Sequence, residues 1–167
     1  MVSAPRPLAQ SDDRAAFDCG RPPLNEWFRR HAWNNHASNA SRVNVIAHVA
    51  SGRIIGYVTL SAAQIERGFL AKPQQRNQPD PVPATLLGQL AVDSMWQGQG
   101  HAFSFLRFAF MTALKASESV GSTAVITHPL DDEVRRFYAR WGFVDLPFDP
   151  RRAMIARMVD IRRRLQT

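Results

Sequence analysis

Gln97-Gly98-Gln99-Gly100 is the segment whose residue types and spacing point most directly to chemistry. It stands between an apolar run ending at Val92 and an amphipathic stretch that starts near Gly100. A glycine loop between a strand and a helix exposes backbone N–H groups at the positive end of the helix dipole, where phosphate binds. The spacing matches neither G-x-G-x-x-G nor a P-loop, which disfavours both of those sites. A tight turn without a ligand is the alternative, because glycine is the usual residue in such turns.

The elements that must hold this loop follow from hydrophobic periodicity. Leu86–Val92 is a short apolar run typical of a buried strand, and the glycine inside it indicates a bulge. The apolar residues from residue 100 to residue 117 recur on one face of a helix. The local unit is therefore strand, glycine loop, helix.

The regions on either side alternate between strand and helix patterns. Further strands are predicted at Thr123–His128 and Met154–Val159. Between them, a helix capped by Asp131 or Asp132 ends at Gly142.

The first half of the chain predicts one helix and one hairpin. Pro22-Pro23 opens an amphipathic helix, and Arg42–Ala50 with Ile54–Leu60 forms an antiparallel pair. Residues 64–83 form a long loop or carry a short helix. We predict a mixed α/β sheet in a single domain over residues 1–167.

Composition and charge narrow the function classes. The 167 residues are 45% hydrophobic and 21% charged, which excludes collagen, coiled-coil and wholly disordered proteins. The formal net charge is +7, and only Lys72 and Lys115 are lysines among 21 basic residues. Most of the excess follows Arg135, so we expect a localised basic surface for an anionic partner.

Cysteine and histidine usage argues against disulfides and metal sites. Cys19 is the only cysteine and is expected to be a small buried residue in a reducing, cytoplasmic setting. The five histidines are scattered, so no metal site is predicted. No signal peptide or membrane span is expected.

Several motifs in order resemble a known family. The sequence L-A-V-D, then Q-x-x-G-x-A, then F-Y-x-x-x-G-F from Phe137 to Phe143 resembles the acetyl-CoA core of GNAT-fold acetyltransferases. The motifs F-D-C-G (17–20), I-G-Y-V-T-L (55–60), P-V-P (81–83) and L-L-G-Q-L-A-V-D resemble the GNAT-type toxins of bacterial toxin–antitoxin pairs. Together they extend over Phe17 to Pro150, most of the chain.

The resemblance implies a fold and a cofactor site. The fold is the GNAT acyl-CoA N-acyltransferase fold, a mixed, mostly antiparallel central sheet with helices on both faces. Acetyl-CoA is the cosubstrate, and the strand end around Leu90, Ala91 and Val92 binds its thioester carbonyl. The backbone amides implied to bind the pyrophosphate are those of Gln97, Gly98, Gln99, Gly100, His101 and Ala102.

Tyr138 is implied to be the catalytic acid. A phenol with a pKa near 10 carries its proton at neutral pH and can protonate the departing thiolate. By periodicity alone, however, Tyr138 lies on the helical stripe of Val134, Phe137 and Trp141 and also fits a core position. Because its place after Phe137 and before Gly142 matches the family motif, the resemblance favours the role of catalytic acid for Tyr138.

The implied function is transfer of acetyl to the α-amino group of aminoacyl-tRNA, which blocks translation. Implied partners are the aminoacyl-tRNA, a cognate antitoxin and a second copy in a homodimer. Alternatives are an acetyltransferase of a small-molecule or protein amine and a non-catalytic basic module that binds nucleic acid. Candidate RNA contacts, each of which also fits a solvated surface, are Arg29, Arg30, Arg42, Arg76, Arg135 and Arg136.

Two positions depart from the family pattern. Gln89 stands where the family commonly has Arg, so one contact with RNA or within the protein is open to question. His101 stands where a small or apolar residue is more usual, and a histidine there is able to tune phosphate affinity with pH. An exposed position without a special role is the alternative for His101.

Overall fold

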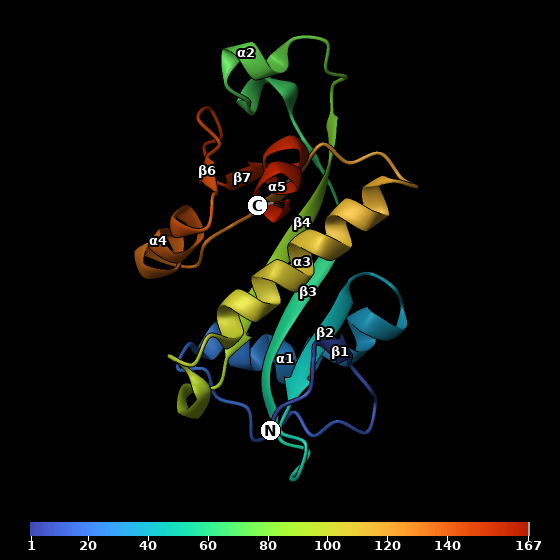
Figure 1. Ribbon diagram of the computed structural model, residues 1–167, viewed down its shortest axis with the longest axis vertical. Coiled ribbons are helices and arrows are strands. Elements are labelled where there is room, and N and C mark those ends of the chain that lie inside the picture. Colours follow the sequence, from blue (N-terminus) through green and yellow to red (C-terminus); the bar gives the residue numbers. More distant parts are fainter. Residues whose placement is uncertain (167) are drawn as a thin grey trace. The chain divides into compact units, whose positions relative to one another are not determined.

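The computed structural model describes residues 1–166 and consists of a sheet with flanking helices (Figure 1). The strands are β1 (Arg6–Pro7), β2 (Arg42–Ala47), β3 (Ile54–Ile65), β4 (Val82–Val92), β5 (Ala124–Thr127), β6 (Val144–Asp145) and β7 (Met154–Arg157). The α-helices are α1 (Pro22–Ala37), α2 (Lys72–Gln75), α3 (His101–Ser117), α4 (Asp132–Arg140) and α5 (Met158–Leu165), with short 3-10 helices η1 (Arg67–Phe69) and η2 (Ser94–Trp96).

The seven strands follow the order β1-β2-β3-β4-β5-β7-β6. β2 pairs antiparallel with both β1 and β3, and β7 pairs antiparallel with both β5 and β6. The expected mixed, mostly antiparallel sheet is therefore confirmed. The predicted hairpin is β2 and β3, with Val45 opposite Tyr57.

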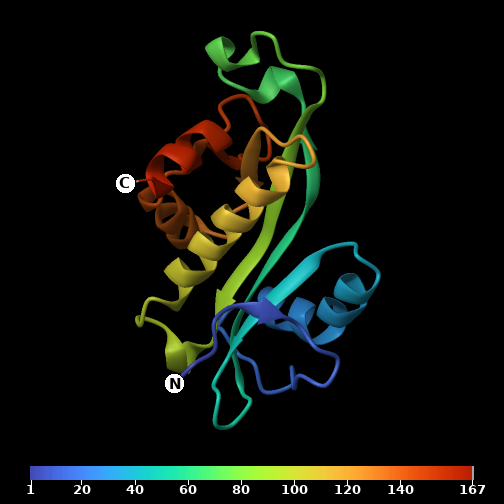
Figure 2. The same ribbon diagram turned by 45° about the vertical axis from the view of Figure 1, so that its right-hand side comes forward.

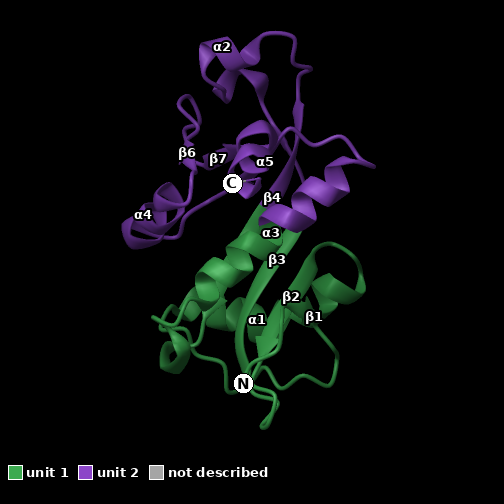
Figure 3. Ribbon diagram, viewed as in Figure 1, with its two compact units in different colours: residues 1–61, 87–109 green, residues 62–86, 110–167 purple. Residues whose placement is uncertain are grey.

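The chain divides into two compact units, which we describe separately (Figure 3). Unit 1 comprises Met1–Ser61 and Leu87–Ala109, and unit 2 comprises Ala62–Leu86 and Phe110–Thr167. β3, β4 and α3 each contribute residues to both units.

In unit 1, helices cover both faces of β3. Tyr57 is fully buried, and its ring stacks on Phe28 of α1 with ring centroids 4.4 Å apart. Gly56 points to the other face, because successive strand residues alternate. A Cβ added there would lie 2.6 Å from the Phe105 ring of α3, so only glycine allows this approach. Figure 2 shows α1 beside the β2–β3 hairpin.

Unit 2 has its own apolar core, built from the ends of four strands and the segments that follow them. Its buried members include Ile65, Ala84, Ile126, Leu146 and Ile155. In α4, the Asp131 carboxylate accepts the N–H of Val134 at 2.9 Å, so the predicted N-cap is confirmed. Gly142 has φ 106°, the left-handed conformation predicted for a helix end.

The structure differs from the sequence expectations at the ends of several strands. β3 extends to Ile65 and β4 begins at Val82, so both are longer than the predicted Ile54–Leu60 and Leu86–Val92. The strand predicted at Met154–Val159 ends at Arg157, and α5 begins at Met158, so Val159 is helical and exposed. The alternating apolar pattern at Met154–Val159 indicated a strand throughout. Met158 instead begins a helix and is buried on the same helical face as Ile161, one turn later. The two-residue strands β1 and β6 were not predicted, because two residues carry no period.

No helix within residues 1–166 is long and apolar enough to cross a membrane.

Candidate functional site

The end of β4 lies deep in unit 1 and is held closely against β3. Ala91 and Val92 are buried, and the N–H of Asp93 donates to the carbonyl of Ile55 at 2.8 Å. Four residues earlier the contact changes: the N–H of Gln89 donates to the side-chain hydroxyl of Thr59 at 3.0 Å. A Cβ on Gly88 would lie 2.7 Å from that hydroxyl oxygen. The glycine that indicated a bulge is thus needed for a close side-chain approach.

The glycine loop follows within unit 1 and is open to solvent. Gly98 and Gly100 have φ of 77° and 88°, and a Cβ at either would meet no heavy atom beyond its chain neighbours within 4 Å. The first bond of α3 runs from Ser104 N–H to Gly100 carbonyl at 3.1 Å. The N–H groups of His101 and Ala102 come before this bond, so they have no hydrogen-bond partner within the helix.

These amides fit an anion. The first turn of α3 carries no acidic side chain that would compete with a bound anion. The residues of the loop itself, from Gln97 to Gly100, are exposed. A seventeen-residue helix places its positive dipole end at this point. The six residues predicted to bind the coenzyme pyrophosphate, Gln97 to Ala102, therefore form one continuous segment at the start of α3, and their binding of it stays a prediction.

The F-D-C-G turn of residues 17–20 holds the start of this loop. The Gln97 side-chain amide donates to the carbonyls of Cys19 and Val92, at 3.0 and 2.8 Å. The Gln97 side chain thus fixes the backbone at Cys19 and Val92, while the backbone N–H of Gln97 stays part of the loop. Sequence reasoning assigned Gln97 only by its amide and did not foresee this role.

Asp93 completes the connection between turn and loop. It is 1% exposed, caps η2 by accepting from Met95 N–H, and also accepts from Asp18 N–H at 3.3 Å. The Arg53 guanidinium lies 3.2 Å from the same carboxylate. Asp93 was missed as a site residue, although it ends the L-A-V-D motif that carried the resemblance.

Cys19 is a structural residue, as expected. It is 4% exposed, its thiol donates to the carbonyl of Arg21 at 3.6 Å, and burial raises the pKa of the thiol. A thiol held protonated in this way is a poor nucleophile.

Gln89 also has an internal role. The hydroxyl of Tyr57 lies 2.7 Å from both the Leu24 carbonyl and the side-chain amide of Gln89. A hydroxyl has one proton, so the Leu24 carbonyl and the Gln89 Oε1 share it as acceptors. The residue that departs from Arg at this position therefore makes its side-chain contact within the protein.

His101 is partly buried and takes part in an aromatic group with Trp96 and His48. The Trp96 ring contacts both imidazoles, with its centroid 5.4 Å from that of His48 and 6.3 Å from that of His101. This group borders the loop on the side where α3 begins.

Tyr138 lies in unit 2, on α4, and is 3% exposed. The rings of Phe137 and Phe143 contact it edge-on, at 5.4 and 5.1 Å. Its hydroxyl has a side-chain hydrogen bond with Thr127, which is buried at the end of β5. Burial raises the pKa of Tyr138 to about 12 despite this bond. The side chain therefore packs as a core residue and keeps its proton at neutral pH, and its role as the catalytic acid stays a prediction.

The candidate RNA-binding arginines differ in whether their side chains already make hydrogen bonds or ion pairs within the protein. Arg135 donates to Asp145 and to the carbonyl of Arg152, at 2.6 and 2.7 Å, and its side chain is 18% exposed. Arg42 contacts the carbonyl and ring of His36. Arg29 donates to the carbonyl of Phe17, and Arg30 pairs with Glu26 one turn away.

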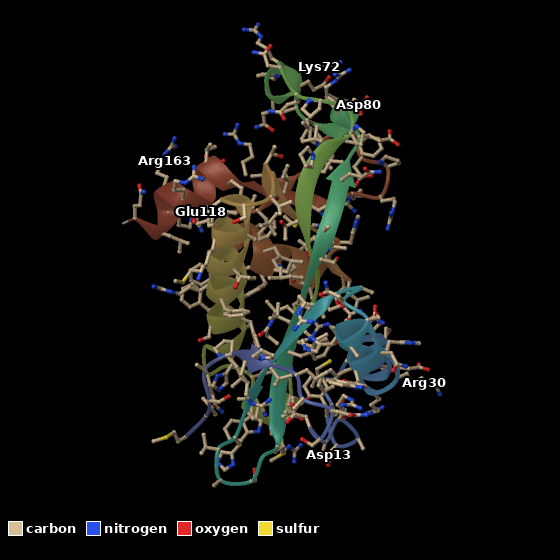
Figure 4. All side chains as sticks on the ribbon, turned by 90° about the vertical axis from the view of Figure 1, so that its right-hand side faces the viewer. Asp13, Arg30, Lys72, Asp80, Glu118 and Arg163 are labelled. Carbon is tan, nitrogen blue, oxygen red and sulfur yellow. The ribbon has the colours of Figure 1, made fainter. Side chains whose placement is uncertain are left out.

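Arg76 and Arg136 are exposed and make no side-chain hydrogen bond or ion pair within residues 1–166. Figure 4 shows Arg30 on α1 and Arg163 on α5 extending from their own helices, and these side chains are 72% and 79% exposed.

The residues described contain no group of three His, Cys, Asp or Glu side chains arranged to bind a metal. No model of a protein family matches the sequence. A tRNA-acetylating toxin of Mycobacterium tuberculosis is 37% identical over 153 residues, which cover 92% of this chain and 91% of that protein. The chain belongs to the tRNA-acetylating toxin family.

Solved structures of GNAT toxins share this fold. AtaT in complex with acetyl-methionyl-tRNAfMet matches with a TM-score of 0.90 and 28% identity over 100% of both chains. AtaTR bound with acetyl-CoA matches with a TM-score of 0.85 and 27% identity over 99% of this chain and 98% of that one. The resemblance to GNAT-type toxins and the expected fold are confirmed. The individual roles of the site residues in this toxin-family chain remain predictions.

Proposed function

We propose that this chain is an acetyl-CoA-dependent N-acetyltransferase that acetylates the α-amino group of an aminoacyl-tRNA. The observation that carries the proposal is the open run of amides at the start of α3, which follows the Leu90–Val92 strand end after η2, in a chain 37% identical to a tRNA-acetylating toxin. As in a toxin–antitoxin pair, acetylation removes the amine that protein synthesis needs, and a cognate antitoxin neutralises the activity.

The residues of unit 1 would hold the cosubstrate. The amides from Gln97 to Ala102 fit the pyrophosphate, and the strand end at Leu90, Ala91 and Val92 is assigned to the thioester carbonyl, whose oxygen gains negative charge during transfer. Acetyl-CoA supplies the activated acetyl group. The Gln97 and Asp93 side chains keep the loop in place while it is occupied.

Proton balance assigns the role of Tyr138 in unit 2. The amine nitrogen forms a bond to the acetyl carbon and loses a proton to solvent, and the carbon–sulfur bond breaks. Tyr138 donates its proton to the departing thiolate and is reprotonated from solvent. An α-amino group has a pKa of about 7.7–8.0, so a fraction is already neutral at physiological pH and no dedicated base is required.

The test is Tyr138→Phe in the full chain, incubated with labelled acetyl-CoA and charged tRNA. We expect the rate of acetyl transfer to fall by about 10²–10⁴-fold, because general acid catalysis contributes on that order. Binding of acetyl-CoA, followed by the shift in melting temperature, stays unchanged, and growth arrest on expression is lost.

Tyr57→Phe is the matched control, because Tyr57 is the only other tyrosine and its hydroxyl serves packing. That variant should melt at a lower temperature yet transfer acetyl at the wild-type rate. Undiminished growth arrest with Tyr138→Phe would refute the acid role. Efficient acetylation of polyamines or peptides, with charged tRNA left unmodified, would refute the acceptor.

We further propose that residues 1–167 act as a single domain, that two copies form a homodimer, and that the protein works in the cytoplasm. The motifs that carry the resemblance extend over most of the chain, and a cytoplasmic location is where charged tRNA is found. Light scattering of the purified protein gives the oligomeric state, and a single cooperative unfolding transition would support the single domain.

A further inference from the structure

The aromatic group beside the α3 loop consists of Trp96, His48 and His101, and these three side chains have no part in the roles assigned above. All three residues belong to unit 1, and each is partly buried. Trp96 lies on η2, His48 directly follows β2, and His101 is the first residue of α3. Two imidazoles held against one indole, beside a loop that fits an anion, are candidates for binding part of that anion.

The His101 side chain has both ring nitrogens unused. It makes no hydrogen bond or ion pair in the part of the chain that the structure describes, and its ring contacts Trp96. Each Cα–Cβ bond of a helix is tilted toward the helix N-terminus, so the side chain of a first helical residue leans toward the loop that precedes it. The imidazole of His101 therefore leans toward Gly98 and Gly100.

His48 differs from His101, because its ring is already bonded. Its Nδ1 lies 2.8 Å from the hydroxyl of Ser51, in the turn between β2 and β3. Its backbone N–H donates to the carbonyl of Arg53 across the same turn, at 2.8 Å. His48 thus shapes the hairpin, and His101 is the imidazole with nitrogens free for a ligand.

Few other charged groups lie on the segments around these rings. His101 is the one ionisable side chain in residues 94–106. The buried Asp93 carboxylate is paired with Arg53 at 3.2 Å. The amino group of Met1 is also near the hairpin turn, since the Met1 carbonyl accepts the N–H of Val49 at 3.0 Å. A positive charge on His101 therefore gains its anionic partner when a ligand occupies the loop.

Proton binding and anion binding at neighbouring positions favour each other. Histidine is the side chain that ordinarily changes charge between pH 5 and 8. A pyrophosphate diester stays negatively charged throughout that range. A bound anion stabilises the protonated ring beside it, and by linkage the protonated ring strengthens anion binding by the same factor.

We propose that the protonated imidazole of His101 donates a hydrogen bond to a pyrophosphate oxygen of acetyl-CoA, so that the protein takes up a proton from solvent as the coenzyme binds. The inference rests on the proposed function, which assigns the pyrophosphate to the amides from Gln97 to Ala102. Trp96 is the positioning residue, because its ring packs against the imidazole. His101 stands where the family more usually has a small or apolar residue, so this proton linkage is a property of this chain.

The test is calorimetric titration of the full chain with acetyl-CoA at pH 6.0, 7.0 and 8.0, in two buffers of different protonation enthalpy. The difference in heat between the buffers measures the protons taken up. The wild type should bind about tenfold more tightly at pH 6.0 than at pH 8.0, the size expected of one partly exposed charge-assisted hydrogen bond. Binding at pH 7.0 should be accompanied by proton uptake.

His101→Gln keeps a neutral donor but carries no charge at any of these pH values. It should bind acetyl-CoA as the wild type does at pH 8.0, within about twofold at all three pH values, and take up no proton. Its melting temperature without ligand shows whether it is folded. His101→Ala, which introduces a small residue as is more usual in the family, takes its place if it is not.

His48→Gln is the matched control, because His48 contacts the same Trp96 ring and its side chain bonds Ser51. This variant should keep the pH dependence and the proton uptake of the wild type. If His48→Gln abolishes both while His101→Gln leaves them unchanged, His101 is not the group that binds the proton, and the proposal is overturned.

Acetyl-dephospho-CoA identifies the phosphate, since it lacks the 3′-phosphate and retains the pyrophosphate. The wild type should bind it with the same pH dependence as acetyl-CoA. If the pH dependence disappears with this ligand, it belongs to the 3′-phosphate, and the contact with the pyrophosphate is refuted.

The same titrations separate this inference from the proposed function. If the wild type binds acetyl-CoA at none of the three pH values, the proposed function fails. If the wild type and His101→Gln bind it with equal pH dependence, only the role of His101 is overturned.

Discussion

His36 shows how a single buried residue links stability to pH. It is 7% exposed, and its Nδ1 accepts the N–H of Val43 at 3.0 Å. The Arg42 guanidinium lies 3.2 Å from Nε2. Both neighbours are donors, so a second ring proton has no acceptor. Burial, followed by the charge of Arg42, lowers the pKa of His36.

The sign of the effect on stability follows from linkage. The unfolded chain takes up the histidine proton near pH 6.5, whereas the folded chain takes it up only at lower pH. Stability is therefore complete above about pH 6.5 and falls as the pH drops from there toward the lowered folded pKa. His36→Gln, which keeps an acceptor for Val43, should flatten this fall in urea unfolding measured at pH 7.5 and 5.5.

His128, whose pKa is also lowered by burial, provides the comparison. It makes no hydrogen bond within the described residues, so His128→Gln removes its titration alone.

His36→Ala should cost about 1–3 kcal/mol of folding stability at pH 7.5, because the buried N–H of Val43 then has no acceptor. Identical pH slopes in wild type and His36→Gln would rule out a role for this ring.

At the scale of elements, the connection between the F-D-C-G turn and the α3 loop is the feature that sequence periodicity does not reveal. Cys19 in the turn and Gln97 in the loop are 78 residues apart in sequence, yet a hydrogen bond joins them. A loop that binds phosphate through its backbone must be held by something other than the ligand, and here side chains supply that support.

Gln97→Ala should weaken acetyl-CoA binding by about tenfold, because the loss of a hydrogen bond of roughly 1.4 kcal/mol loosens the start of the loop. Calorimetric titration measures the dissociation constant, and steady-state kinetics should give a raised KM with kcat little changed. Gln97→Glu, which lacks the donor, should behave alike.

Gln99→Ala is the matched control, since Gln99 is in the same loop, is exposed and makes no side-chain hydrogen bond in the described chain. Its dissociation constant should stay within about twofold of wild type. Equal effects of the Gln97 and Gln99 variants would show that the connection does not position the loop.

At the scale of the whole molecule, the net charge of +7 matters through the arginines that remain free. Arg135 and Arg136 are neighbours on α4 with different surroundings. Arg135 is bound to Asp145 and Arg152, whereas Arg136 is exposed. Counterion release gives each phosphate contact a share of the salt dependence of RNA binding.

If Arg136 contacts tRNA, Arg136→Gln should lower the slope of log K against log salt by about one. Filter binding of charged tRNA at several salt concentrations measures this slope. Arg135→Gln should instead lower the melting temperature and leave the slope near that of wild type. A larger change of slope for Arg135→Gln than for Arg136→Gln would contradict this division.

Local signals in the sequence predicted the strand–loop–helix units and the glycine loop. Pro22-Pro23, Asp131 and Gly142 act on their immediate neighbours, so the limits of α1 and α4 follow from local backbone chemistry. The strand–loop–helix around Gly98 and Gly100 is likewise local, and the motifs within it indicated the family.

Which side chains support that loop, and which are free, depends on contacts made only in the folded chain. Asp93 and Gln97 act across long sequence separations, and a one-dimensional pattern cannot reveal their partners. The same holds for the arginines, which look alike in sequence until a carboxylate or carbonyl lies beside one of them. It holds also for the aromatic group at Trp96, because His48 comes to it from a distant stretch of chain.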